Sequence, residues 1–175
     1  MSKRAAERQQ KAVSWVSRVG GFVRYDWQPK GRVKPNDPTG PRVPDYLLKT
    51  LGQEPFQSVR HIAVADPVLD DTTPLGTQTS LTELYVDSQY STYDLTPISK
   101  LRRLEHLTLH ASRFDSLAPL IGLPALKVLE IRDTVLPEGL ADDFQRSRPD
   151  VEFITTPPTS ERVVDERDIV RDWKD

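Results

Sequence analysis

The chain has 175 residues, with no cysteine, 24 Lys or Arg residues and 26 Asp or Glu residues. This length corresponds to about one domain, the lack of cysteine excludes a disulfide scaffold and cysteine-based catalysis or zinc binding, and the balanced charge gives no general case for binding nucleic acid. No apolar run approaches the ~20 residues of a membrane-spanning helix, and no signal-peptide apolar segment follows Met1.

Residues 1–55 are predicted to form an N-terminal cap. Apolar residues recur at helical spacing over 3–19, and a Gly-Gly pair ends that helix. A short strand rich in aromatic and β-branched residues follows over 22–27. Five prolines over 28–44 remove backbone donors and exclude regular structure, so this segment is a loop or linker. A second, short helix is expected over 45–51.

The N-terminal arm is basic, since residues 1–34 carry nine Lys or Arg residues and two Asp or Glu residues. A charge run of this kind is typical of a solvated helix face, and it also suits contact with anionic lipid or an acidic partner. The basic residues on the predicted helix that would make such a contact are Lys3, Arg4, Arg8 and Lys11.

An internal repeat begins at residue 56. The pattern L-x-x-L-x-x-L-x-L starts at Leu101 and returns at Leu123, and a short Leu-x-Pro-apolar segment recurs around Pro97 and Pro119. Those segments are too short for an α-helix, and Pro97 and Pro119 would break one. Five units follow one another at intervals of 22, 23, 22 and 22 residues, centred on Ile62, Leu84, Leu107, Leu129 and Val151. One unit cannot bury its own leucines, whereas stacked units share a continuous core.

This pattern resembles the leucine-rich repeat family in its 22-residue, internalin-like form, over residues 56–154. The resemblance implies an α/β solenoid: a short horseshoe with parallel strands on its concave face, 3₁₀ or extended returns on its convex side and a helical N-terminal cap. The basic helix, Gly-Gly pair, aromatic strand and Pro-rich loop are similar to a group of bacterial, planctomycete-like leucine-rich repeat proteins. Many of those proteins have a membrane helix just upstream of the basic helix. The resemblance therefore implies one of two locations: the cytoplasm, or the soluble portion of a membrane-anchored protein.

The turns after the strands depart from the family's pattern, because its usual Asn is replaced. We therefore expect an incomplete side-chain ladder and looser turns, especially at Pro67 and Gln89. The replacing residues are Pro67, Gln89, Ser112 and Thr134.

The repeat domain is predicted to span 56–156 and to end in its own cap. A helical stretch over 137–148 replaces the usual return, and a last edge strand covers 150–153. A charged tail over 157–175 follows, in which a helix through Trp173 and disorder are both open.

Alternation along each predicted strand places leucines in the core and the intervening residues on the concave surface. Neighbouring strands bring two rows of side chains together, His61–Glu83–His106 and Asp87–His110–Arg132. A carboxylate beside a histidine raises its pKa, so these rows could respond to pH. The candidate partner-binding residues are His61, Glu83, Tyr85, Asp87, His106, Thr108, His110, Glu130 and Arg132.

The sequence favours a non-enzymatic module that binds another protein on this surface, without cofactor, metal or nucleic acid. No phosphate loop, G-x-S-x-G or H-E-x-x-H motif occurs. Two alternatives stay open. One is a membrane-associated scaffold that uses the basic arm, and the other is a metal-binding protein that uses the His61–Glu83–His106 row.

Overall fold

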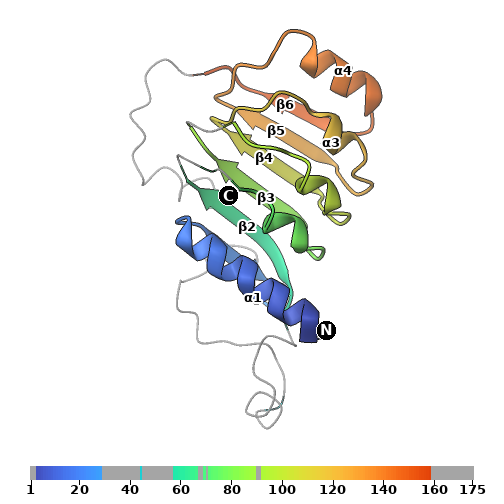
Figure 1. Cartoon of the computed structure of the whole chain (residues 1–175). Coiled ribbons are helices and arrows are strands. Elements are labelled where there is room, and N and C mark those ends of the chain that lie inside the picture. Colours follow the sequence, from blue (N-terminus) through green and yellow to red (C-terminus); the bar gives the residue numbers. More distant parts are fainter. Residues whose placement is uncertain are drawn as a thin grey trace.

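The computed structural model describes residues 3–28, 44, 57–66, 69, 71–89 and 92–158. Six strands form one mixed sheet in chain order, in which β2 to β6 run parallel and β1 pairs antiparallel with β2 (Figure 1). The strands are β1 (Phe22–Tyr25), β2 (Val59–Ala65), β3 (Glu83–Asp87), β4 (His106–His110), β5 (Val128–Arg132) and β6 (Glu152–Thr155).

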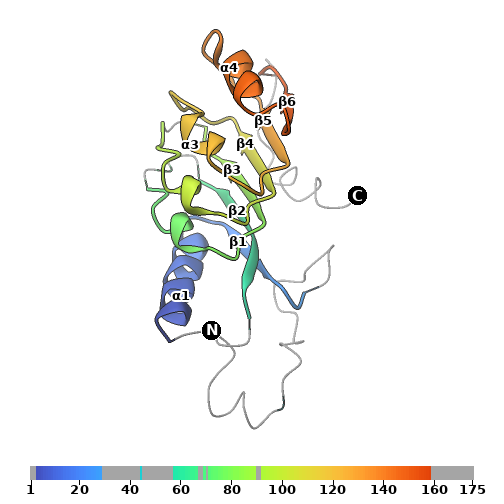
Figure 2. The ribbon, with the colours of Figure 1, turned by 90° about the vertical axis from the view of Figure 1, so that its right-hand side faces the viewer.

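Helical segments line one face of this sheet (Figure 2). One follows each of β2 to β5, and together with the N-terminal helix they contact one another in chain order. Pro74 and Pro97 immediately precede two of them with φ near −60°, the angle that the proline ring fixes and a first helical turn needs. The segments are α1 (Lys3–Arg18), η2 (Leu75–Thr77), η3 (Ile98–Lys100), α3 (Ala118–Ile121) and α4 (Leu140–Ser147).

The core lies between the strands and the helical segments. Leu84, Leu107 and Leu129 are direct neighbours in adjacent strands, and each is at most 2% exposed. At the level of the returns, Gly76 packs so closely on the next segment that an added Cβ would lie 2.6 Å from the carbonyl oxygen of Pro97. The predicted repeat thus produces an α/β arrangement of strand and helical return. The return α3 corrects the expectation of 3₁₀ or extended segments, because it is a short α-helix that places Pro119 in its first turn, where proline is tolerated.

The last strand departs from the predicted register. Leu129 pairs with Phe153, so the last interval is 24 residues, and β6 begins two residues later than the predicted strand at 150–153. The cause is α4, because its eight residues lengthen the return before β6. Phe144 of α4 lies in the core with its ring 5.4 Å from that of Phe153.

Hydroxyl groups take the place of the missing Asn ladder after β4 and β5. The Thr134 hydroxyl accepts a hydrogen bond from the Ser112 amide at 3.2 Å and donates to the Arg132 carbonyl at 2.9 Å. The Ser112 hydroxyl donates to the His110 carbonyl at 2.9 Å and accepts from Tyr93. The expectation of an incomplete ladder is therefore wrong in these two turns, since short hydroxyls satisfy the same backbone groups.

Both ends of the sheet are covered. At the start, α1 buries Ala12 and Val16 against the sheet. At the end, Arg148 donates to the carbonyls of Ile121, Leu123 and Leu126 while Asp150 holds its guanidinium at 2.8 Å. Carbonyl groups at the end of a repeat array need such a donor.

Three predicted segments lie outside the described residues: most of the proline-rich loop, the helix at 45–51 and the tail beyond 158. Within the residues that the structure does describe, no helix has the length and apolar character to cross a membrane.

Candidate functional site

The face of the sheet opposite the helical segments presents the alternate residues of β2 to β5; we call it the strand face. Both predicted rows are in register there: His61 pairs with Glu83 and Glu83 with His106, while Asp87 pairs with His110 and His110 with Arg132. A third row lies between them and holds Tyr85, Thr108 and Glu130. All nine predicted residues therefore belong to one face, but their surroundings differ.

At the start of the face, Glu83 joins Arg24 and His61. Its Oε2 lies 2.8 Å from Nη2 of Arg24 and 2.8 Å from Nδ1 of His61. The ring of Phe22 stacks on the His61 imidazole with centroids 5.7 Å apart. We call Arg24, His61 and Glu83 the Arg24 cluster.

His61 is only 2% exposed, which corrects its prediction as a surface residue. The reason is β1, which pairs antiparallel with β2 and places Arg24 directly opposite His61. Burial lowers the pKa of His61, and the nearby Arg24 charge lowers it further against the opposing effect of Glu83. With its hydrogen on Nδ1, the neutral ring donates to the Glu83 carboxylate, which can only accept.

This arrangement also bears on the metal hypothesis for the His61–Glu83–His106 row. The Glu83 oxygen that would bind a metal is already in contact with Arg24, whose guanidinium is a permanent cation. Across the described part of the chain, no group of three His, Asp or Glu side chains is placed to hold a metal ion. Two residues of the row, His61 and Glu83, thus belong to an ion-pair cluster with Arg24.

At the far end of the same strands, His110 lies between two carboxylates. Its Nδ1 is 3.0 Å from Oδ2 of Asp87, and its Nε2 is 2.9 Å from Oδ2 of Asp133. The Asp87 contact is off-line for a hydrogen bond, so charge attraction dominates it. The Tyr85 ring stacks beside the imidazole with centroids 6.3 Å apart. We call Asp87, His110 and Asp133 the His110 cluster.

Here the pKa of His110 is raised, first by the Asp87 carboxylate and further by Asp133, while partial burial opposes both. Asp87 itself is 5% exposed, so its prediction as a presented residue is corrected as well. Asp133 was missed because it follows the strand in a left-handed turn with φ +49°. The signal available in the sequence was its type, since Asp tolerates that conformation better than most residues.

Arg132 is the register neighbour of His110 on β5. Its Nε lies 2.7 Å from Oε1 of Glu130, and the second Glu130 oxygen accepts from the Thr108 hydroxyl at 3.5 Å. Together with His106 and Tyr85, these residues are partly or fully exposed. We call the set Tyr85, His106, Thr108, Glu130 and Arg132 the central patch.

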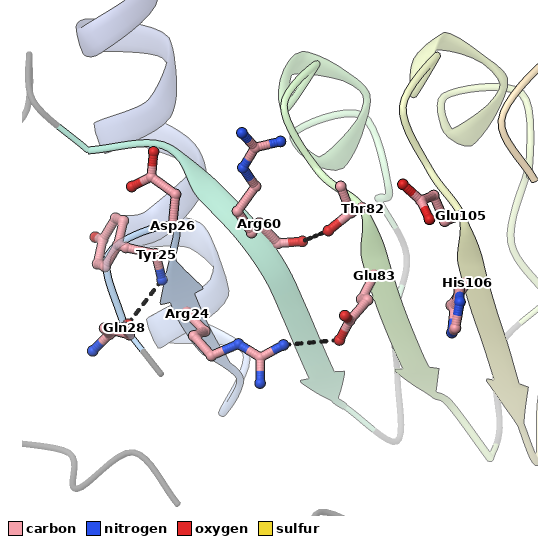
Figure 3. A pocket seen from close by; sticks show the side chains of 9 residues that line it. All are labelled: Arg24, Tyr25, Asp26, Gln28, Arg60, Thr82, Glu83, Glu105 and His106. Atoms are coloured by element: carbon pink, nitrogen blue, oxygen red, sulfur yellow. Dashed lines mark hydrogen bonds and ion pairs between the residues drawn. The ribbon is translucent and has the colours of Figure 1, made fainter. Parts of the chain in front are cut away.

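A polar pocket of about 310 Å³ lies where β2, β3 and β4 begin (Figure 3). Arg24 and Glu83 meet across it, and Glu105 and His106 line its far side next to β4. Sequence reasoning had found only two of its residues, because several come from strand starts and from the turn after β1. The lining residues are Arg24, Tyr25, Asp26, Gln28, Arg60, Thr82, Glu83, Glu105 and His106.

Neither cluster places a nucleophile beside a histidine. In the His110 cluster both ring nitrogens face carboxylates, whereas a general base needs one nitrogen free to accept a proton. The chemistry that this face offers is charge, hydrogen bonding and an aromatic ring.

No protein-family model matches this sequence, and no curated protein matches it. Among solved structures, the chain is similar to an internalin from Listeria monocytogenes at 18% sequence identity, over 57% of this chain and 35% of that one, with a TM-score of 0.35. The chain thus spans about a third of that internalin. The likeness is weak, so the fold class depends on the repeat and on the strand register.

Proposed function

We propose that the chain is a short leucine-rich repeat solenoid, a non-enzymatic module that binds a partner protein on its concave strand face. The match between the repeat interval and the strand register supports the solenoid. Leu84, Leu107 and Leu129 are 23 and 22 residues apart and lie side by side in adjacent strands. Stacking of such units buries one continuous core, and the helical returns take the convex side.

One observation carries the binding role: the central patch places five exposed or partly exposed polar side chains side by side on rigid strands. Groups that are already ordered lose little conformational entropy when a partner binds. Tyr85 and Arg132 are of the residue types that most often anchor protein interfaces. His61 and Asp87 are too buried to contact a partner and support the surface from below.

Affinity capture from the native lysate tests this role. The wild-type chain should retain a partner from the lysate. The Tyr85→Ala/Arg132→Glu variant should retain at least about ten times less of it, because an interface hot spot is lost. The control carries Thr96→Ala and Lys100→Glu, which make the same change in charge at exposed positions on the convex side. Circular dichroism must show that both variants are folded, and titration calorimetry with the identified partner gives the affinities. Equal retention by all three chains would contradict binding through the central patch.

The membrane alternative stays a separate prediction. On α1, Arg4, Arg8 and Lys11 are exposed while the apolar side packs on the sheet. If the arm binds anionic lipid, sedimentation with phosphatidylserine vesicles should be lost in high salt and when these residues are changed to Gln. Vesicle binding that neither change affects would exclude an electrostatic anchor.

A further inference from the structure

The His110 cluster connects three consecutive strands through one ring. Asp87 belongs to β3, His110 to β4 and Asp133 to the turn that follows β5. Side-chain exposure is 6% for Asp87, 16% for His110 and 20% for Asp133, so water competes little for these contacts. A charge contact between neighbouring repeats is therefore stronger here than on an open surface.

A doubly protonated imidazole fits this geometry best. Its Nε2–H can donate to the Asp133 carboxylate, which can only accept, and its positive charge attracts Asp87 across the short contact at Nδ1. A neutral ring has one hydrogen, and it would leave a nitrogen lone pair against either Asp87 or Asp133 at about the same short distance. Loss of one proton thus turns an attractive contact into a repulsive one.

The turn after β5 begins with a left-handed residue that His110 contacts. The backbone of Asp133 has φ +49°, a conformation that few non-glycine residues adopt. The bond from His110 Nε2 to Oδ2 of Asp133 holds this residue at 2.9 Å. The next residue, Thr134, accepts the hydrogen bond of the Ser112 amide. The turn after β5 therefore also holds the turn after β4 in place.

We propose that His110 is a proton-controlled clasp: when charged, it holds Asp87 and Asp133 together and fixes the turn after β5 beside the strand face, and when neutral it releases that turn. The clasp goes beyond the proposed binding function and does not depend on it. Its effect on a partner would follow from Tyr85, which stacks on the clasping ring at the edge of the central patch.

Charged and titratable groups of three elements lie around His110. Tyr85 and Asp87 face it from β3, and Asp133 faces it from the turn after β5. Arg132 is its register neighbour on β5, but its guanidinium is paired with Glu130. Tyr93, from the loop after β3, donates its hydroxyl to Ser112, and burial raises its pKa so that it stays neutral where histidine titrates.

The test is an NMR titration of the full chain with isotope-labelled histidine. We expect the His110 ring to lose its proton at a higher pH in the folded chain than in the same chain unfolded in urea. As the pH passes that midpoint, the protection factor of the Ser112 amide should fall about tenfold, because its acceptor lies in the released turn. A His110 midpoint at or below that of the unfolded chain would overturn the proposal, and so would unchanged Ser112 protection across the midpoint.

Two variants complete the design. Asp133→Asn should lower the His110 midpoint and weaken Ser112 protection already at low pH, because one of the two carboxylates is gone. His106→Gln changes an exposed histidine on the same strand and should leave Ser112 protection as in the wild type. An Asp133→Asn chain with wild-type midpoint and protection would exclude the clasp, even if a His110 variant failed to fold.

Discussion

Two histidines on the same sheet lie beside carboxylates at nearly equal distances, yet their pKa values shift in opposite directions. His61 lies 2.8 Å from Glu83, and His110 lies 3.0 Å from Asp87. The pKa of His61 is lowered and that of His110 is raised. Burial is the main cause at His61, and the Arg24 charge adds to it. At His110 the Asp87 carboxylate outweighs partial burial, and Asp133 adds a second negative charge. A His–carboxylate pair read from a sequence therefore does not define a charge.

The largest expected effect comes from breaking the Arg24 cluster at its centre. Glu83→Gln removes the only carboxylate that Arg24 and His61 share within this cluster and leaves a guanidinium of 13% exposure without its charge partner. We expect the free energy of unfolding to fall by about 3 kcal/mol, the cost of removing one partner of a buried ion pair. Urea unfolding followed by circular dichroism measures this change.

Glu152→Gln is the matched control, because Glu152 belongs to the same strand face and is exposed. It should change the free energy of unfolding by less than about 0.5 kcal/mol. Equal losses in the two variants would mean that the Arg24 cluster has no special energetic role.

A second prediction uses pH to separate the two histidines. The raised pKa of His110 means that its contribution to stability is fully present below the unfolded pKa of about 6.5 and is lost as pH rises through the folded pKa. The His110→Gln chain should thus be less stable than wild type by about 1.5 kcal/mol at pH 6, and the gap should close toward pH 9.

His61 gives the opposite pH dependence. Its lowered pKa makes the wild type lose stability as pH falls below about 6.5, where the unfolded chain binds the proton more readily. In the His61→Gln chain, the difference from wild type should therefore shrink toward acid pH. Urea unfolding at a series of pH values checks both variants, and parallel curves for the two would refute the comparison.

Replacing Arg24 should have a smaller effect, which is a change in the pKa of one histidine. His61 should then behave more like His110. Without Arg24, the charge of Glu83 acts on His61 alone, so the pKa of His61 should rise toward that of a carboxylate-paired histidine. NMR titration of Arg24→Gln measures this shift, with Arg132→Gln as the control because Arg132 pairs with Glu130. An unchanged His61 pKa would show that burial alone sets its charge.

The smallest effect is expected for a short but exposed ion pair just before β4 and β5. Lys127 Nζ lies 2.6 Å from Oε2 of Glu105, but the two side chains are 65% and 38% exposed. Lys127→Ala should change the free energy of unfolding by less than about 0.5 kcal/mol, because water competes for both charges. A loss as large as that of Glu83→Gln would mean that distance outweighs burial in this protein.

The repeat predicted the sheet because leucines at fixed intervals have a single arrangement that buries all of them. It also predicted both side-chain rows, since register and alternation follow once the leucines are aligned. The repeat could not predict the burial of His61. That burial comes from β1, a strand outside the repeat that pairs antiparallel with β2.

Local backbone geometry accounts for the other differences. Asp133 reaches His110 through a left-handed turn that no periodic pattern encodes. The shift of β6 arises from a return of different length, because α4 replaces the short segment of the earlier units. Sequence periodicity thus specified what recurs in the chain, while the two clusters depend on segments that occur once.

The close contact at Gly76 affects the curvature of the sheet. Hydrogen bonding keeps neighbouring strands about 4.8 Å apart, so curvature depends on how far apart the returns behind them lie. Because a Cβ at Gly76 would meet the Pro97 carbonyl at 2.6 Å, any larger residue there would push η2 and η3 apart and tighten the arc in front of them. A single glycine on the back of the molecule thereby helps to set the radius of the surface on the other side.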